Sequence, residues 1–228
     1  MKVFGILGGM GPKATMLLMN KVFELVQAED DKDHIPLIVH QNTQVPSRIK
    51  AIIDGTGKSP LPVLKKMAHD LQIVGSDFLA MPCNTAHYYF DDIQSGVEIP
   101  ILNMIEITID TLKRRKFKKI GLLASPAVER MAVFEPHFEN KQLTAQYADE
   151  EIMLDLIKQI KKDNFNIDLE NTFLSECQNL IDEGCDGLLI ACTELSLVSS
   201  ILPAEMNWVD SLDCLSRSIV STAKISEY

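Results

Sequence analysis

The chain has 228 residues, 46 % of them apolar and 24 % charged, which is ordinary for a globular protein long enough to bury a sizeable core. Its net charge of −10 argues against nucleic-acid binding, and no apolar run approaches the ~18 residues of a membrane span. The five cysteines include no Cys-x-x-Cys pair, so neither a disulfide framework nor a zinc ribbon is indicated. We expect a cytoplasmic protein with reduced thiols, without a metal, and with no nucleic-acid or membrane partner.

Short apolar runs alternate with helix-length periodic segments along the chain. Helices are predicted between the apolar runs, with the clearest apolar faces in residues 13–28, 60–74 and 169–183. Uninterrupted apolar strands that alternate with helices are typical of parallel sheets covered on both faces, so the fold class is α/β. The predicted strands are, in chain order, 3–7, 36–40, 77–81, 99–102, 119–123, 143–147, 187–191 and 208–210.

One pattern occurs twice. Each copy indicates a helix that ends at a glycine, a buried strand, and a cysteine just past the carboxyl end of that strand. Residues 4–9 and 120–125 form a second pair of similar segments, although chance likeness between Leu-rich strands is the alternative. We therefore predict two similar parallel-sheet lobes related by a pseudo-twofold, residues 1–104 (completed by 209–228) and residues 105–208. The repeated residues are Leu71, Gly75, Asp77, Cys83 and Leu180, Gly184, Asp186, Cys192.

The repeat has a chemical consequence for two of the cysteines. Ligands of open parallel sheets bind beyond the carboxyl ends of the strands, so the two lobes would bring Cys83 and Cys192 to opposite sides of one cleft. One thiolate can then remove a proton from one face of a carbon while the opposite thiol returns a proton to the other face. For Cys177, Cys185 and Cys214 we expect buried structural thiols.

Three motifs, in this order, give the chain a family resemblance over essentially its whole length. They are Gly8-Gly9-Met10-Gly11-Pro12, Met81-Pro82-Cys83-Asn84-Thr85-Ala86-His87 and Ala191-Cys192-Thr193-Glu194-Leu195. The chain resembles the cofactor-independent aspartate/glutamate racemase family, and its aspartate-type members most. The resemblance implies a paired-lobe fold with the active site between the lobes, two-base racemisation by one cysteine from each motif, no cofactor, a small amino-acid substrate, and a homodimer.

Several motif residues have a second interpretation. The glycine-rich turn could be a dinucleotide fingerprint, but the acid that should close the second strand about 20 residues on is missing. We instead expect Met10 and Gly11 to present backbone N–H groups to a substrate carboxylate. The polar residues Asn84, Thr85 and Thr193 fit helix caps, substrate donors, or both. For His87 a place on a helix face is favoured over a catalytic role.

Charge and the family resemblance point to the remaining binding residues. Arg48 stands where the family keeps a substrate-binding arginine, and Lys162, 30 residues before Cys192, where aspartate-type members carry a lysine for the other carboxylate. A solvated helix face that includes Lys162 is the alternative. Ser125 keeps the first hydroxyl of a turn that is usually hydroxyl-rich in the family, and Glu194 completes the expected binding set. In the same turn Val128 replaces the second hydroxyl and Arg130 is unexpected, so the substrate stays open.

The sequence thus predicts cofactor-independent racemisation of an acidic amino acid, aspartate first and glutamate next. The alternative is a non-catalytic amino-acid-binding or sensing protein of the same fold, which the changed turn keeps open. A thiol redox protein is disfavoured, because a disulfide needs Cα atoms ~4.4–6.8 Å apart and would leave no room for a substrate.

Overall fold

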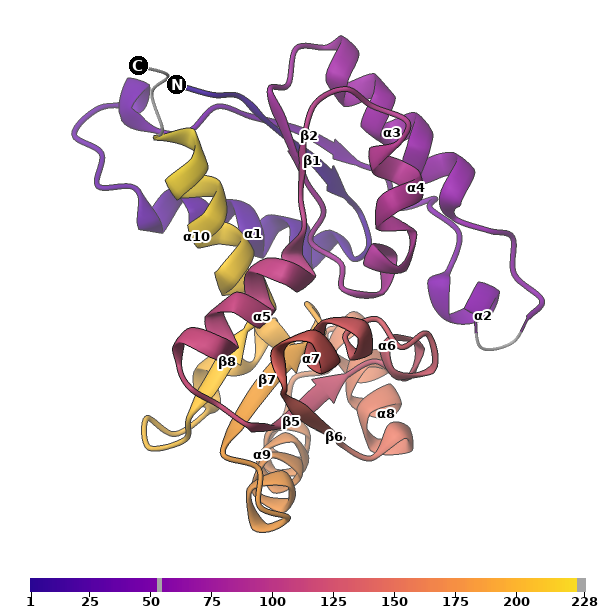
Figure 1. Ribbon diagram of the computed structural model, residues 1–228, viewed down its shortest axis with the longest axis vertical. Helices are drawn as coiled ribbons and strands as arrows, with labels where there is room; N and C mark the ends of the chain where they lie inside the picture. The colour runs from indigo at the N-terminus through magenta and orange to yellow at the C-terminus, as the bar shows by residue number, and fades with distance from the viewer. Residues whose placement is uncertain (53–54, 225–228) are drawn as a thin grey trace.

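The computed structural model, which describes residues 1–52 and 55–224, contains two four-stranded parallel sheets (Figure 1). The first sheet has the strand order β2-β1-β3-β4 and the second the order β6-β5-β7-β8. The two orders are the same when each sheet is counted from its own first strand, which confirms the predicted pair of similar α/β lobes. The strands are β1 (Phe4–Gly8), β2 (Leu37–Gln41), β3 (Phe78–Ala80), β4 (Ile101–Leu102), β5 (Lys119–Ala124), β6 (Thr144–Tyr147), β7 (Gly187–Ala191) and β8 (Trp208–Asp210).

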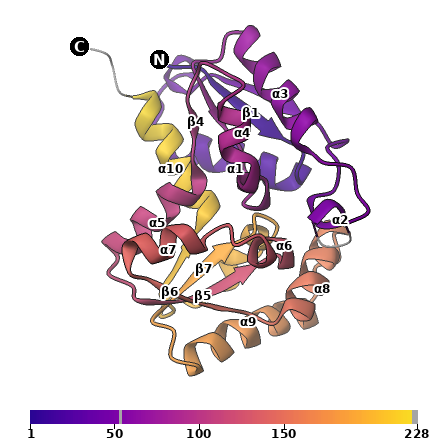
Figure 2. The same ribbon diagram turned by 45° about the vertical axis from the view of Figure 1, so that its right-hand side comes forward.

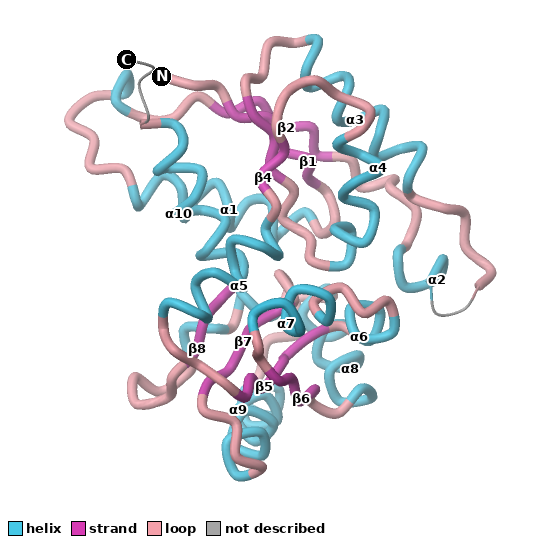
Figure 3. Tube along the Cα trace, viewed as in Figure 1, coloured by secondary structure: helices cyan, strands magenta, loops and turns pink. Residues whose placement is uncertain are grey.

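Helices cover the faces of both sheets (Figure 3). The helix predicted at 13–28 ends earlier, at Leu25, because the backbone of Val26 is already extended. Each predicted strand lies within two residues of an observed strand. The helices are α1 (Pro12–Leu25), α2 (Arg48–Ile52), α3 (Leu61–Ile73), α4 (Phe90–Gln94), α5 (Met104–Arg114), α6 (Pro126–Arg130), α7 (Glu135–Lys141), α8 (Glu150–Lys161), α9 (Ile167–Asp182) and α10 (Ser211–Ala223).

The repeated aspartates do the same work in each lobe. The Asp77 carboxylate accepts a hydrogen bond from the Val3 backbone N–H at 2.7 Å, just before β1. In the second lobe the Asp186 carboxylate accepts from the Lys118 backbone N–H at 3.0 Å, just before β5. Each aspartate therefore ties the entrance of one central strand to the entrance of its neighbour, which fixes the register at the amino end of the sheet.

Two strand glycines let a helix pack closely on each sheet. A Cβ on Gly5 would lie 3.1 Å from Leu71 Cβ in α3, and one on Gly121 would lie 2.9 Å from Leu180 Cβ in α9. Protein interiors are close-packed, so any side chain at these positions would push the helix away from the strand. The second similarity between the lobes, at residues 4–9 and 120–125, thus reflects a shared packing requirement.

Two helices pass between the lobes. In α10, Leu212, Leu215 and Ile219 belong to the core beneath the first sheet, and Figure 1 shows α10 beside α1. Helix α5 is shared, because Met104 lies in that same core while its later apolar residues pack under the second sheet. On these contacts we place α10 with the first lobe, whereas the boundaries at 104/105 and 208/209 stay predictions. Within the described residues, the helices lack the length and apolarity that crossing a membrane requires.

Candidate active site

A small cavity of about 40 Å³ lies between the lobes, where the carboxyl ends of the two sheets meet. Its walls come from both lobes, so neither lobe forms the cavity alone. The first lobe contributes Met10, Ser47, Arg48, Cys83 and Thr85, and the second contributes Ser125, Ile157, Lys161, Cys192 and Glu194.

The two motif cysteines reach this cavity from opposite lobes. Cys83 follows β3 and Cys192 follows β7, and their exposed fractions are only 5 % and 6 %. Both strands are apolar and largely buried, and each leads into the loop that carries its cysteine. The sequence repeat thus brings one buried thiol from each lobe to a shared cavity.

Glu194 controls the charge around Cys192. The Cys192 thiol donates to Glu194 Oε2 at 3.3 Å, and Lys161 Nζ lies 3.4 Å from Glu194 Oε1. Burial raises the pKa of Cys192 well above its ordinary value, and the negative charge of Glu194 raises it further, against a smaller opposing effect of Lys161. Cys192 is therefore a protonated thiol at neutral pH, and a carboxylate oxygen is in place to accept its proton.

His87 links the Cys83 loop to the start of α5. Its Nε2 accepts from the Met104 backbone N–H at 3.1 Å, so the ring proton lies on Nδ1, which donates to the Cys83 carbonyl at 2.9 Å. Burial lowers the pKa of His87 to about 4, so the ring is neutral at physiological pH. His87 lies in the short 3-10 helix Thr85–Tyr89, where it is buried, and it is outside the cavity lining.

Arg48 brings a cation to the first-lobe side of the cavity. Its Nη2 donates to the Met10 carbonyl at 3.2 Å and its Nη1 to the Pro46 carbonyl at 3.4 Å, which hold the guanidinium in place. Its Nε is buried and has no hydrogen-bond partner within the described part of the chain. A buried donor without a partner is costly, so this N–H is a suitable contact for a substrate carboxylate.

A pair of hydroxyl groups joins the two lobes at the cavity. Thr85 Oγ1 and Ser125 Oγ lie 3.1 Å apart, and either can donate. The glycine-rich turn approaches from the same region, since a Cβ on Gly11 would lie 3.1 Å from Glu194 Oε1. Gly11 therefore allows the Glu194 carboxylate to lie close against the backbone of the turn.

Four predicted binding residues do not line the cavity: Gly11, Asn84, Lys162 and Thr193. Asn84 donates through Nδ2 to Ser211 Oγ at 2.9 Å, and Thr193 donates through Oγ1 to the Pro82 carbonyl at 3.3 Å. Lys162 is exposed just beyond the carboxyl end of α8, where its backbone N–H closes the last turn.

Ser47, Ile157 and Lys161 also line the cavity, although no sequence motif indicates them. The helical period contains a signal for the last of them. Met153, Ile157 and Lys161 are spaced four residues apart, so they share one face of α8, and the first two are buried. Lys162, 30 residues before Cys192, is the next residue along the chain and does not lie on that face.

The unusual residues of the turn after β5 lie away from the cavity. Val128 is fully buried in the core of the second lobe. Arg130 forms an ion pair with Glu150 on the protein surface. Of this turn only Ser125 contacts the cavity, so neither Val128 nor Arg130 alters its lining.

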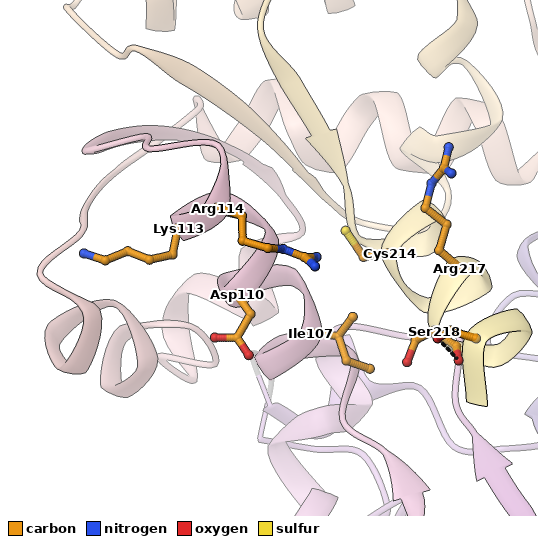
Figure 4. A pocket seen from close by; sticks show the side chains of 8 residues that line it. Ile107, Asp110, Lys113, Arg114, Cys214, Arg217 and Ser218 are labelled. Atoms are coloured by element: carbon orange, nitrogen blue, oxygen red, sulfur yellow. Dashed lines mark hydrogen bonds between the residues drawn. The ribbon is translucent and has the colours of Figure 1, made fainter. Parts of the chain in front are cut away.

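A larger, more open groove of about 760 Å³ lies between α5 and α10 (Figure 4). Lys113, Arg114 and Arg217 give it cations, but it contains none of the predicted site residues. Cys214 borders it, and burial raises the pKa of this thiol, as it does for Cys177 and Cys185. Among the residues that the structure describes, no group of three or more His, Cys, Asp and Glu side chains is arranged to hold a metal ion.

The sequence profile of the Asp/Glu/hydantoin racemase family matches residues 7–219. The chain belongs to this family. A Bacillus subtilis (strain 168) protein named broad specificity amino-acid racemase RacX is 29 % identical, over 96 % of this chain and 97 % of the relative. The resemblance seen in the three motifs is thereby confirmed, and the protein is an amino-acid racemase, an isomerase.

Solved structures agree with the fold of this racemase. The aspartate racemase of Picrophilus torridus superposes with a TM-score of 0.84 at 27 % identity, covering 98 % of this chain and 94 % of that one. An aspartate racemase homologue from Pyrococcus horikoshii OT3 gives a TM-score of 0.77 at 22 % identity, covering 99 % and 100 %. At the lower identity only the two-lobed fold is supported.

Proposed function

We propose that this racemase interconverts the enantiomers of an acidic amino acid, aspartate first and glutamate next, by proton transfer between Cys83 and Cys192 without a cofactor. One observation carries the proposal: the two thiols line a single small cavity from opposite lobes. Two groups placed in this way can reach opposite faces of one carbon, which is the geometry that inversion requires.

The proton balance follows from the resting state of Cys192. A Cys83 thiolate removes the α-proton, and the bonding electron pair stays on the substrate as a carbanion delocalised into its carboxylate. The Cys192 thiol then delivers its proton to the opposite face, which leaves Cys192 as the thiolate and Cys83 as the thiol. The reverse reaction exchanges the two roles, and Glu194 Oε2, 3.3 Å from Cys192 Sγ, is a nearby acceptor when that thiol must deprotonate.

The charges in the cavity support an acidic substrate. The partnerless Arg48 Nε suits one carboxylate, and Lys161, rather than the neighbouring Lys162, is the lysine available for the second. Fixed donors in a narrow cavity can stabilise the negative charge that develops on the substrate. The Thr85–Ser125 hydroxyl pair supplies such donors.

The proposal extends to the cell compartment and the assembly. All five cysteines are free thiols, which suits the reducing cytoplasm. We also propose a homodimer, on the basis of the family resemblance alone.

The first test follows the α-carbon in D₂O. Purified protein is incubated with L-aspartate, L-glutamate and a wider amino-acid panel, without pyridoxal phosphate or metal, and chirality and deuterium content are measured. We expect deuterated D-enantiomer from the acidic substrates. The wider panel is needed because the Bacillus subtilis relative is named for broad specificity. No deuterium in any amino acid would contradict catalysis and favour the amino-acid-binding alternative.

The two-thiol step is tested by single substitutions. Cys83→Ser and Cys192→Ser should each abolish nearly all inversion, because a serine hydroxyl is a much weaker acid than a thiol. Each variant should retain exchange or elimination of only one enantiomer, and the two variants should prefer opposite ones. Cys177→Ser and Cys185→Ser serve as controls that keep inversion. Inversion that survives the loss of either motif cysteine would disprove the two-thiol mechanism.

A further inference from the structure

Two hydrogen-bonded connections join the cysteine motifs outside the cavity lining. In the first, Thr193 Oγ1 donates to the Pro82 carbonyl at 3.3 Å, so the residue after Cys192 is joined to the residue before Cys83. We call this connection the Thr193 brace. It runs from one lobe to the other.

The second connection runs in the opposite sense. Asn84, the residue after Cys83, donates through Nδ2 to Ser211 Oγ at 2.9 Å. Ser211 Oγ in turn donates to the Ile190 carbonyl at 3.0 Å, in the strand that leads to Cys192. We call this connection the Ser211 brace.

The two braces begin at equivalent positions but are built differently. Thr193 donates directly to the carbonyl beside Cys83, whereas Asn84 is joined to the Ile190 carbonyl, two residues before Cys192, only through Ser211 Oγ. The two sheets share no strand pairing, so the braces join the lobes at the level of the thiols where the sheets do not. This arrangement fixes the two cysteine loops relative to each other.

Burial makes both braces effective. Asn84 and Thr193 are each 2 % exposed and Ser211 is fully buried, so water does not compete for their hydrogen bonds. The single hydroxyl proton of Ser211 goes to Ile190, so Ser211 must accept from the Asn84 amide nitrogen. This requirement sets the orientation of the Asn84 side chain and thereby holds the loop next to Cys83.

We infer that Ser211 is a positioning residue which, with the Thr193 brace, holds the two thiols at the separation that inversion requires. The inference rests on the proposed two-thiol function. Inversion needs both sulfur atoms within reach of the same carbon, and a displacement of about 1 Å can cost about 100-fold in rate. A one-sided reaction, in which a single thiolate removes the α-proton, needs only one thiol. It therefore tolerates a change in the distance between the two sulfur atoms.

The test compares these two reactions in Ser211→Ala. Inversion is measured in both directions with the amino acid that the wild type racemises best. The one-sided reaction is elimination from the 3-chloro derivative of that amino acid, in which a thiolate takes the α-proton, the C–H electron pair forms a double bond and chloride leaves. We expect inversion to fall about 10- to 100-fold while elimination changes less than about threefold.

Ser216→Ala is the matched control. Ser216 lies on the same helix, is also buried, and donates to the Asp213 carbonyl at 2.9 Å without touching either motif. Both of its rates should equal those of the wild type. If Ser211→Ala loses its thermal transition, Thr193→Val, which preserves the side-chain shape, carries the test through the other brace.

A folded Ser211→Ala with an unchanged ratio of inversion to elimination would overturn the inference, and so would an equal loss of both rates. A wild type that racemises no amino acid would instead overturn the proposed function. The two failures are therefore told apart by the wild type alone.

Discussion

The two carboxylate oxygens of Glu194 have different partners. Oε2 accepts a hydrogen bond from the Cys192 thiol, with 3.3 Å between the oxygen and Sγ. Oε1 faces the Lys161 ammonium, with Nζ 3.4 Å away. The side chain is only 10 % exposed, so its charge is poorly screened from the sulfur. A single residue thus disfavours the Cys192 thiolate and orients the lysine beside it.

Glu194→Gln should therefore make the Cys192 thiol more acidic. Burial, the largest cause of its raised pKa, stays, but the negative charge that raises the pKa further is removed. The thiolate then forms at lower pH. For the enantiomer on which Cys192 is the base, we expect the rising limb of kcat/KM against pH to move to lower pH.

The matched control is Glu150→Gln, which removes an exposed carboxylate paired with Arg130. It should leave the pH profile in place. A rising limb that stays fixed or moves to higher pH in Glu194→Gln would show that Glu194 does not govern the charge state of Cys192.

At the residue scale, motif identity was a better guide than spacing. The motif cysteines, Arg48 and Glu194 all line the cavity as the sequence indicated. Lys162, which spacing indicates, lies outside the cavity lining while Lys161 lies within it, because one residue along a helix turns the side chain by about 100°. Ser211 could not be found at all, since 127 residues separate it from Asn84 and no local pattern connects them.

Among the elements, the sequence predicts the buried strands but not the shortest helices. Buried parallel strands are continuous apolar runs, so all eight strands were located within two residues. Helices α2, α4 and α6 have five residues each, too few to show a helical period. Helices α2 and α6 contact each other although they are distant in the sequence, and no local pattern indicates such a contact.

Gly121 is a position where a side chain would disturb the packing of a helix on a strand. A Cβ there would lie 2.8 Å from Leu188 Cδ2 and 2.9 Å from Leu180 Cβ, so α9 would have to move off β5. Gly121→Ala should lower the free energy of unfolding by about 1–3 kcal/mol, as overpacked cores do. Urea unfolding measures the change.

Gly96→Ala is the comparison variant, because Gly96 is exposed and its added Cβ would come no nearer than 3.3 Å to another atom. Its unfolding midpoint should change less than that of Gly121→Ala. Equal midpoints for the two variants would refute the close helix–strand packing as the reason for glycine at this position.

In the molecule as a whole, the cavity between the lobes is narrow. Its volume of about 40 Å³ has room for about three water molecules. We expect a substrate to enter by an opening between the lobes. Figure 2 shows the lobes approaching each other at α2, α6 and α8.

Lys13 forms a contact that such an opening must break. It lies in α1 of the first lobe and pairs with Asp163, just past α8 of the second. Its Nζ is also 5.3 Å from the centre of the Phe165 ring. The pair is largely solvent-exposed, so we expect it to contribute a modest, salt-dependent stabilisation of the closed arrangement.

Lys13→Ala should accordingly raise KM with little change in kcat. Exposed ion pairs contribute about 0.2–1 kcal/mol, which corresponds to a rise in KM of about 1.4- to 5-fold. Added salt should raise the wild-type KM towards that of the variant, because screening weakens the same pair. Lys66→Ala is the control, since it removes the Lys66–Asp70 pair within α3 of a single lobe and should leave KM unchanged. If Lys13→Ala and Lys66→Ala had the same KM at low salt, the closed arrangement would not depend on this contact between the lobes.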